Sequence, residues 1–596
     1  MSSNFTVRTA DDGSRVIAAE QQLGAYPETV CADLVAWAQR RPDATFLAER
    51  QADGWQHLTY RDAHDRARSI GAGLLNSGAS PESPLGVIAD NSIDHALVAL
   101  AAMYVGIPFA PISVGYVAPE AGPARLREML ATLGASVFFA GSAETAARIT
   151  AARAGARVIT DLAELAGDGA VSDDAFARVK ADTIAKIMFT SGSTGSPKGV
   201  VTTNRMLCSN QAMLAMVWPE IAASRPVAVD WLPWSHCFGG SHNFGIILHN
   251  GGTLYIDDGR PAPGPFAATL RNLGAFPPTV FFSVPRGFVL LVEALHSEPG
   301  FAAAFFSKLR VICNAGASLP DTIRRDLIAL AQAYGTGSVR ITSSWGTTET
   351  APLATTAWGA PEPDVDTIGT PAPGVEIKFA PADGRAEIRV RGPNVTPGYW
   401  RNPAATGEAF DAEGFYKTGD AAELKDGADP SRGILFGGRL AENFKLSSGT
   451  WVNVGALRLS LLEHGAPLVE DVVIAGHDRN ELAALIFVSR AHAAKFAGTP
   501  QAEHAEIARQ PSVRGFVAAA IARHNSNAPA SSTKVTRALI LLEPPQRDAG
   551  EITDKGSINQ RRSLELRAAS VQTLYAERPG SDVLIVDLTT AKAGTS

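Results

Sequence analysis

Short apolar runs alternate with amphipathic helical patterns along most of this 596-residue chain. The sequence predicts buried strands at residues 84–90, 106–112, 184–189, 227–233, 279–285 and 309–316. Residues 95–105 have the pattern of a helix, and residues 58–75 place Ala63, Ala67 and Ile70 on one helical face. This alternation predicts an α/β fold, with helices layered on largely parallel sheets.

The length and the change of pattern along the chain predict two domains. After about Gly437 the elements become shorter, with strands expected at residues 469–476, 482–490 and 538–545 and a helix at residues 513–525. One more strand is expected at residues 581–589. We therefore expect a large N-terminal domain of layered sheets and helices over residues 1–437. A smaller, mobile α+β domain is expected over residues 438–596.

Composition and charge exclude several classes of protein. Apolar residues make up 45% and charged residues 19% of the chain, and the net charge of -7 includes no basic block, so neither nucleic acid nor an anionic membrane is an expected partner. No apolar run is long enough to span a bilayer, and the first residues lack a secretory pattern. Four cysteines that lie far apart favour a reducing cytoplasm.

The stretch FTSGSTGSPKGVV, residues 189–201, follows one predicted strand directly and precedes another apolar run. Glycine lets backbone approach an anion, Ser and Thr add hydroxyl donors, and Lys198 adds a positive charge, so the stretch predicts a phosphate cradle. A kinase-type P-loop does not fit, because no hydroxyl follows Lys198 directly. The alternative is a flexible linker, but linkers rarely separate two apolar runs.

Two further segments carry groups suited to a nucleotide. In SSWGTTET, residues 343–350, Trp345 offers a flat face to a base, Thr348 a hydroxyl, and Glu349 a hard oxygen for Mg²⁺. In GFYKTGD, Asp420 could accept bidentate hydrogen bonds from two ribose hydroxyls. The order of these segments resembles the adenylate-forming superfamily of acyl-CoA synthetases, luciferases and adenylation domains. The resemblance covers about residues 58–562.

The resemblance implies a site for ATP, Mg²⁺ and coenzyme A. The implied nucleotide-binding residues are Thr190, Ser191, Gly192, Ser193, Thr194, Gly195 and Lys198 in the loop, Ala315, Gly316 and Ala317 in NAGASLP, Trp345, Gly346 and Thr347, and Asp420 with Arg439. Thr348 and Glu349 are implied in catalysis, with Glu349 also as the metal ligand.

The predicted C-terminal domain carries the remaining implied residues. The family's pivot position holds Ala441, and Lys445 would face the site during the coenzyme A step. GEITDKGSINQRR, residues 550–562, resembles the motif of the adenylation lysine. Lys555 is assigned that role, although the commonest register would align Ser557 with the lysine.

The segment DWLPWSHCFGGSHNF, residues 230–244, points to the acid. His236 is implied as a wall and gate of the acyl pocket, and nearby aromatic residues suit an aryl acid, although such a cluster is also typical of a core. The spacing of Cys237, His242 and His249 matches no tight zinc pattern.

This segment, with residues 251–261, 442–455 and 551–562, resembles bacterial feruloyl-CoA synthetases. The expected reaction is therefore ATP-dependent activation of a hydroxycinnamic acid and its transfer to coenzyme A, with a homodimer also allowed. The alternatives are a ligase or adenylating enzyme for another aryl or fatty acid, and a non-catalytic nucleotide-binding module.

Overall fold

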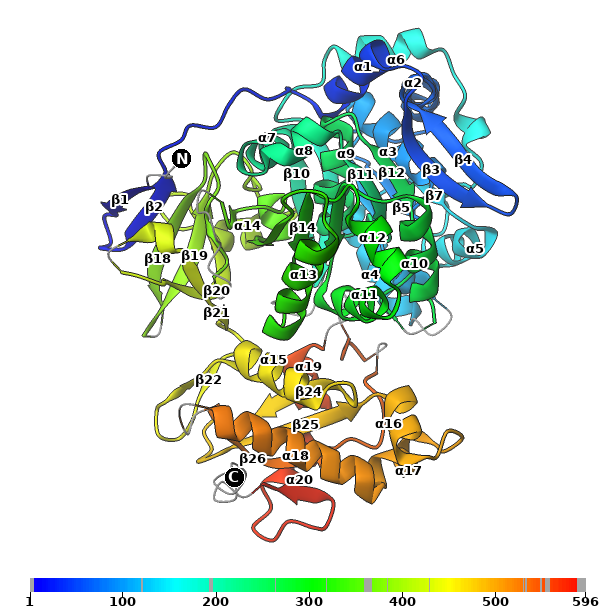
Figure 1. The fold of residues 1–596 in the computed structure, drawn as a ribbon. Coiled ribbons are helices and arrows are strands. Elements are labelled where there is room, and N and C mark those ends of the chain that lie inside the picture. The colour runs from blue at the N-terminus through cyan, green and yellow to red at the C-terminus, as the bar shows by residue number, and fades with distance from the viewer. Residues whose placement is uncertain are drawn as a thin grey trace. The chain divides into compact units, whose positions relative to one another are not determined.

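The structure is a computed structural model (Figure 1). It describes residues 5–118, 122–191, 197–262, 264–317, 319–358, 367–382, 384–427, 429–528, 530, 533–546, 549–552 and 558–586. The chain divides into two compact units, Met1–Thr418 with Glu423–Leu435, and Gly419–Ala422 with Phe436–Ser596. The predicted α/β class, with a large N-terminal and a smaller C-terminal part, is confirmed.

The first sheet of the larger unit has the strand order β10-β9-β6-β5-β7-β8. Its strands are β5 (Leu85–Ile88), β6 (Phe109–Pro111), β7 (Val137–Ala140), β8 (Arg157–Ile159), β9 (Ile184–Ser191) and β10 (Pro197–Thr203). All neighbours run parallel except β10, which runs antiparallel to β9. The hairpin of β9 and β10 therefore brackets the predicted phosphate loop.

Helices α2 (Tyr60–Leu75) and α3 (Ile93–Tyr104) pack against each other in this unit. The Thr59 side chain caps α2 by accepting a hydrogen bond from the Asp62 amide. Ala63, Ala67, Ile70 and Leu74 are all buried, as the four-three-four spacing predicts. In α3, every residue except Asp94 is buried, which explains its almost wholly apolar sequence.

Two further sheets contain mainly parallel strands. One has the order β13-β14-β15-β16-β17, with strands β13 (Val280–Ser283), β14 (Val311–Asn314), β15 (Arg340–Trp345), β16 (Thr355–Thr356) and β17 (Thr370–Pro371). The other has the order β11-β12-β3-β4, with strands β3 (Thr45–Gln51), β4 (Gly54–Thr59), β11 (Val227–Asp230) and β12 (Thr253–Ile256). The predicted strands at 227–233, 279–285 and 309–316 are thus confirmed.

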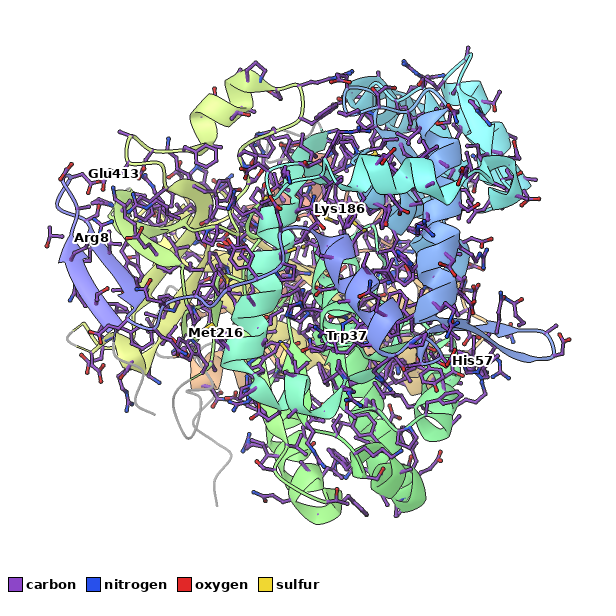
Figure 2. The ribbon with its side chains drawn as sticks, turned by 90° about the horizontal axis from the view of Figure 1, so that it is seen from above. Arg8, Trp37, His57, Lys186, Met216 and Glu413 are labelled. Carbon is purple, nitrogen blue, oxygen red and sulfur yellow. The ribbon has the colours of Figure 1, made fainter. Side chains whose placement is uncertain are left out.

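An antiparallel sheet departs from the expected largely parallel pattern. Its order is β1-β2-β18-β19-β20-β21, with strands β1 (Phe5–Thr9), β2 (Arg15–Ala19), β18 (Glu376–Ala382), β19 (Arg385–Arg391), β20 (Tyr416–Leu424) and β21 (Ile434–Arg439). Lys378 is only 2% exposed and pairs with Asp12, Asp411 and Glu413 at 2.8, 3.3 and 2.6 Å. Arg8 of β1 also approaches Glu413, at 4.0 Å (Figure 2). The pairing of β2 with β18, which lie far apart in the sequence, completes this sheet, and periodicity alone did not reveal it.

The smaller unit is built on the sheet β24-β25-β26-β27. Its strands are β24 (Val469–Ala475), β25 (Leu482–Val488), β26 (Val535–Ile540) and β27 (Val583–Ile585), and helices α15 (Val454–Gly465) and α18 (Pro511–Asn527) pack together. Each strand and α18 were predicted. Within the described ranges of both units, no helix combines the length and apolar character that crossing a bilayer requires.

Candidate active site

The parallel strands β13, β14 and β15 bring two of the predicted nucleotide segments side by side. Ser283, Asn314 and Ser343 are register partners across these strands, and the chain turns shortly after each of them. Ligands of α/β sheets commonly bind outside the carboxyl ends of the strands. This edge is therefore the first candidate for the nucleotide site.

Glycines shape both turns at this edge. Gly316 follows β14 with φ of +88°, a conformation that an L side chain rarely adopts, and the Asn314 amide donates to the Ala317 carbonyl at 2.7 Å across the turn. Gly346 follows Trp345, and a Cβ there would lie 1.6 Å from the Pro352 carbonyl oxygen. The turns therefore require glycine, and they leave Ala315 and Ala317 next to the strand ends.

Two buried amides hold the loop that carries Thr347, Thr348 and Glu349. Asn394 Nδ2 donates to the carbonyls of Thr350 and Leu353 at 3.0 and 2.7 Å, and Asn210 Nδ2 donates to the same Leu353 carbonyl at 2.9 Å. Both amides are fully buried. These interior hydrogen bonds from the two amide nitrogens fix the loop geometry, and sequence reasoning did not identify either residue.

Glu349 and Lys198 both contact the side chain of Tyr399. The Tyr399 hydroxyl donates to Glu349 Oε1 at 3.0 Å, and Lys198 Nζ lies 5.2 Å from the centroid of the Tyr399 ring. Burial, and then the Glu349 charge, raise the pKa of Tyr399 and that of Tyr416 beside it. The structure thus joins a lysine, a carboxylate and two tyrosines that remain protonated near pH 7.

The phosphate-loop strands fix part of the predicted cradle. Lys198 is the register partner of Thr190 across β9 and β10, and the Trp400 amide donates to the Gly199 carbonyl at 2.7 Å. Residues 192–196, which include the predicted Gly192, Ser193, Thr194 and Gly195, lie outside the described residues, as does the side chain of Ser191. Their roles stay predictions.

The segment around His236 reaches the same loop. Thr348 Oγ1 donates to Cys237 Sγ at 3.5 Å, and the Phe238 amide donates to His236 Nδ1 at 3.1 Å. Cys237 leads directly into a π-helical turn, η3 (Phe238–Asn243). The predicted acyl-pocket segment and the segment of Thr348 are therefore neighbours.

Asp420 and Arg439 form an ion pair within the smaller unit. Arg439 Nε lies 3.0 Å from Asp420 Oδ1, and the carboxylate side chain is only 4% exposed. The sequence placed Asp420 in the N-terminal domain, whereas residues 419–422 group with the smaller unit. The pair is consistent with the predicted contacts of both side chains with one ribose.

The other predicted residues of the smaller unit have separate surroundings. Lys445 lies on β22 (Phe444–Lys445), opposite Trp451 of β23 (Trp451–Val452), with Nζ 4.9 Å from an aromatic centroid of Trp451. Lys555 and Ser557 fall within residues 553–557, outside the described part. The flanks of that segment are held by a bridge between Ile552 and Ile558.

The residues around Glu349 fit Mg²⁺ bound together with phosphates. Mg²⁺ is usually held in such sites by one or two carboxylates and the substrate phosphates rather than by an all-protein cage. Glu349 supplies one carboxylate, 8% exposed, on a loop that the amides of Asn210 and Asn394 hold in place. No cluster of three or more potential metal-ligating side chains occurs among the described residues, so substrate phosphates and water would supply the remaining ligands.

Comparison with known proteins defines the class. A family model described as AMP-binding enzyme matches residues 34–400, and one described as AMP-binding enzyme C-terminal domain matches residues 443–579. The chain therefore belongs to the AMP-binding enzyme family. This confirms the resemblance to adenylate-forming enzymes and supports the use of ATP.

Individual relatives are distant. A feruloyl-CoA synthase of an Amycolatopsis species is 28% identical over 403 residues, which cover 66% of this chain and 76% of the relative. A malonate–CoA ligase of Arabidopsis thaliana is 28% identical over 430 residues, which cover 67% of this chain and 65% of the relative.

Solved structures share the fold at still lower identity. ATP-bound MatB from Rhodopseudomonas palustris matches with a TM-score of 0.68 at 20% identity, over 91% of this chain and 99% of that one. The O-succinylbenzoate coenzyme A synthetase MenE from Bacillus subtilis, in complex with AMP, matches with a TM-score of 0.67 at 17% identity. The match covers 94% of this chain and 100% of that one.

Proposed function

We propose that this protein is an AMP-forming acid–CoA ligase that activates a hydroxycinnamic acid such as ferulate and transfers it to coenzyme A. The observation that carries the proposal is the cluster of Lys198, Tyr399 and Glu349, which joins the phosphate-loop strand to the loop after Trp345. The similarity to a feruloyl-CoA synthase supports the choice of acid. So do the buried aromatic residues around His236, which are Trp231, Trp234, Phe238 and Phe244.

In the first half-reaction, the substrate carboxylate attacks the α-phosphorus of ATP and pyrophosphate leaves. Two anions repel each other, so the enzyme must position them and neutralise their charge. Lys198 and the loop residues 190–195 would hold the departing phosphates, and Thr348 would contact the α-phosphate. Trp345 and the turn 315–317 would bind the adenine, while Asp420 and Arg439 would bind the ribose.

Glu349 would hold Mg²⁺ close to the phosphates. The bound ion supplies charge neutralisation at the phosphate oxygens. Tyr399 donates to one oxygen of Glu349 and thereby orients the carboxylate. Because the pKa of Tyr399 is raised, its hydroxyl stays protonated and keeps donating at neutral pH.

The second half-reaction transfers the acyl group from AMP to the coenzyme A thiol. The acyl-adenylate is a mixed anhydride that must be kept from water, and His236 would close the acyl pocket around it. A domain of residues 438–596 would pivot near Ala441, so that Lys555 acts in adenylation and Lys445 faces the site during thiolation. The proposal includes a cytoplasmic location and allows a homodimer, which light scattering would test.

The decisive experiment measures AMP release with ferulate, 4-coumarate, caffeate, benzoate and octanoate, each with and without coenzyme A. Release that depends on both a hydroxycinnamate and coenzyme A is expected. ATP binding without any acid-dependent release would instead support a non-catalytic nucleotide-binding module.

Lys555→Ala tests the assignment of the adenylation lysine. The variant should lose pyrophosphate exchange but still thiolate preformed acyl-adenylate, because the lysine would act only on the first step. Lys495→Ala, at an exposed lysine of the same unit, is the matched control. Equal loss of both steps would reject Lys555.

A ligase for a different acid is the second candidate. The Arabidopsis malonate–CoA ligase is as similar in identity as the feruloyl-CoA synthase, so identity alone does not choose between an aromatic and a small dicarboxylic acid. Adding malonate to the same panel separates the two candidates.

A further inference from the structure

His242 is a histidine buried within an aromatic cluster of the larger unit. It lies on the π-helical turn η3 and is only 1% exposed. The rings of Trp218, Phe238 and Phe282 lie edge-on to it, with centroids at 5.9, 5.3 and 5.2 Å. Such apolar surroundings disfavour a charged imidazole, and burial lowers the pKa of His242 to about 4.

Two hydrogen bonds fix the tautomer of this histidine. Asn243 Nδ2 donates to Asp230 Oδ2 at 2.8 Å, so the amide oxygen Oδ1 of Asn243 faces the imidazole. His242 Nδ1 lies 2.8 Å from that oxygen and must carry the proton in order to donate to it. Nε2 of the neutral ring is therefore an acceptor.

The acceptor at Nε2 is unsatisfied, and so is the indole N–H of Trp218, whose ring lies edge-on to the imidazole. Within the described part of the chain, neither His242 Nε2 nor the indole Nε1 of Trp218 has a hydrogen-bond partner. Leaving a buried polar atom unpaired is costly, so such atoms call for an explanation. A hydroxyl group can donate one hydrogen bond, so a ligand hydroxyl suits the acceptor Nε2.

The location of His242 indicates which ligand could bring that hydroxyl. Phe282, which contacts His242, is the penultimate residue of β13, at the same sheet edge as the turns after β14 and β15. At its other end, η3 follows Cys237, which contacts Thr348. The turns after β14 and β15 carry the predicted nucleotide-binding segments, whereas β13 and η3 carry none of those residues, so we assign the acid to the side of β13 and η3.

We propose that His242 is a specificity-determining residue that accepts a hydrogen bond from a hydroxyl on the aromatic ring of the acid. The inference rests on the proposed function, because it presumes an aromatic acid with its carboxylate toward Thr348. It goes further in assigning recognition of the ring hydroxyl to one atom, Nε2. The chain of Asp230, Asn243 and His242 holds that atom ready as an acceptor before the substrate arrives.

The test compares 4-hydroxycinnamate with cinnamate, which lacks only the hydroxyl. The wild type should favour 4-hydroxycinnamate in kcat/KM. In His242→Phe, which keeps a ring but no acceptor, that preference should fall by about 10- to 100-fold, the loss expected when a buried hydroxyl loses its partner. His242→Gln, whose amide oxygen can take the place of Nε2, should restore part of the preference.

A control variant and a second measurement keep the outcomes distinct. His95→Phe alters another buried histidine, whose Nδ1 already lies 3.2 Å from the Asp90 carbonyl, and should leave the preference unchanged. If a variant turns over too slowly for kinetics, calorimetric titration with each acid gives the preference as a ratio of the two dissociation constants. An unchanged preference in His242→Phe overturns the assignment of His242 alone, whereas a wild type that activates neither acid refutes the proposed function and this inference with it.

Discussion

Replacing Lys186 with methionine should make the stability of the larger unit less dependent on pH above 7. Lys186 lies in β9, is 5% exposed and donates through Nζ to the Gly240 carbonyl of η3 (Figure 2). Ser241 Oγ is 3.5 Å from Nζ, and the Phe109 ring centroid is 5.5 Å from it. Burial lowers the pKa of this amine from 10.5 to about 7, and the nearby Cys237 only partly opposes the shift.

The size and sign of the effect follow from this shift. In the unfolded chain Lys186 keeps its proton up to about pH 10.5, whereas in the folded protein it loses the proton near pH 7, so folding is penalised most below pH 7. The full penalty is about 5 kcal/mol, since one pKa unit corresponds to about 1.4 kcal/mol. Between pH 7 and 9 the wild type should therefore gain about 2 kcal/mol in unfolding free energy relative to Lys186→Met.

Urea unfolding followed by tryptophan fluorescence measures this difference, because eight of the nine tryptophans precede residue 418. Lys186→Met also removes the donor to Gly240, but that loss of about 1 kcal/mol is constant with pH and does not affect the slope. Lys308→Met, at an exposed lysine of the same unit, is the matched control, and its unfolding free energy should change with pH as that of the wild type does. If the unfolding free energy of Lys186→Met changes with pH from 7 to 9 in the same way as that of the wild type, Lys186 does not have a depressed pKa and the reasoning is wrong.

Three further predictions concern the candidate site. Tyr399→Phe removes the 3.0 Å hydrogen bond to Glu349 and should slow acid-dependent pyrophosphate exchange about tenfold, and an unchanged rate would separate Tyr399 from the reaction. Chelation with EDTA should abolish AMP release and added Mg²⁺ should restore it, whereas full release in EDTA would exclude the role proposed for Glu349. Gly346→Ala should lower the unfolding free energy by about 2–4 kcal/mol, because its Cβ would lie 1.6 Å from the Pro352 carbonyl oxygen. A urea midpoint equal to that of the wild type would contradict this.

Much of the fold was predictable because its signals are local. The spacing of Ala63, Ala67 and Ile70 predicted the buried face of α2, and the apolar run at residues 482–490 predicted β25, whose residues are all buried. The antiparallel pairing of β18 with β2 was not predicted, because it joins Ile377 to Ile17 across most of the chain. Periodicity identifies a strand but not its distant partner.

The candidate site was likewise predictable only in part. The sequence by itself determined which chemical groups are present: a loop of hydroxyls and glycines with Lys198, a carboxylate at Glu349, and the order of the segments that defines the family. Only the tertiary structure decided that Tyr399 lies between Lys198 and Glu349, that His242 presents Nε2 as an acceptor, and that burial depresses the pKa of Lys186. The physical reason is that motifs reflect neighbours along the chain, whereas the protonation and pairing of a buried group depend on residues that only folding brings next to it.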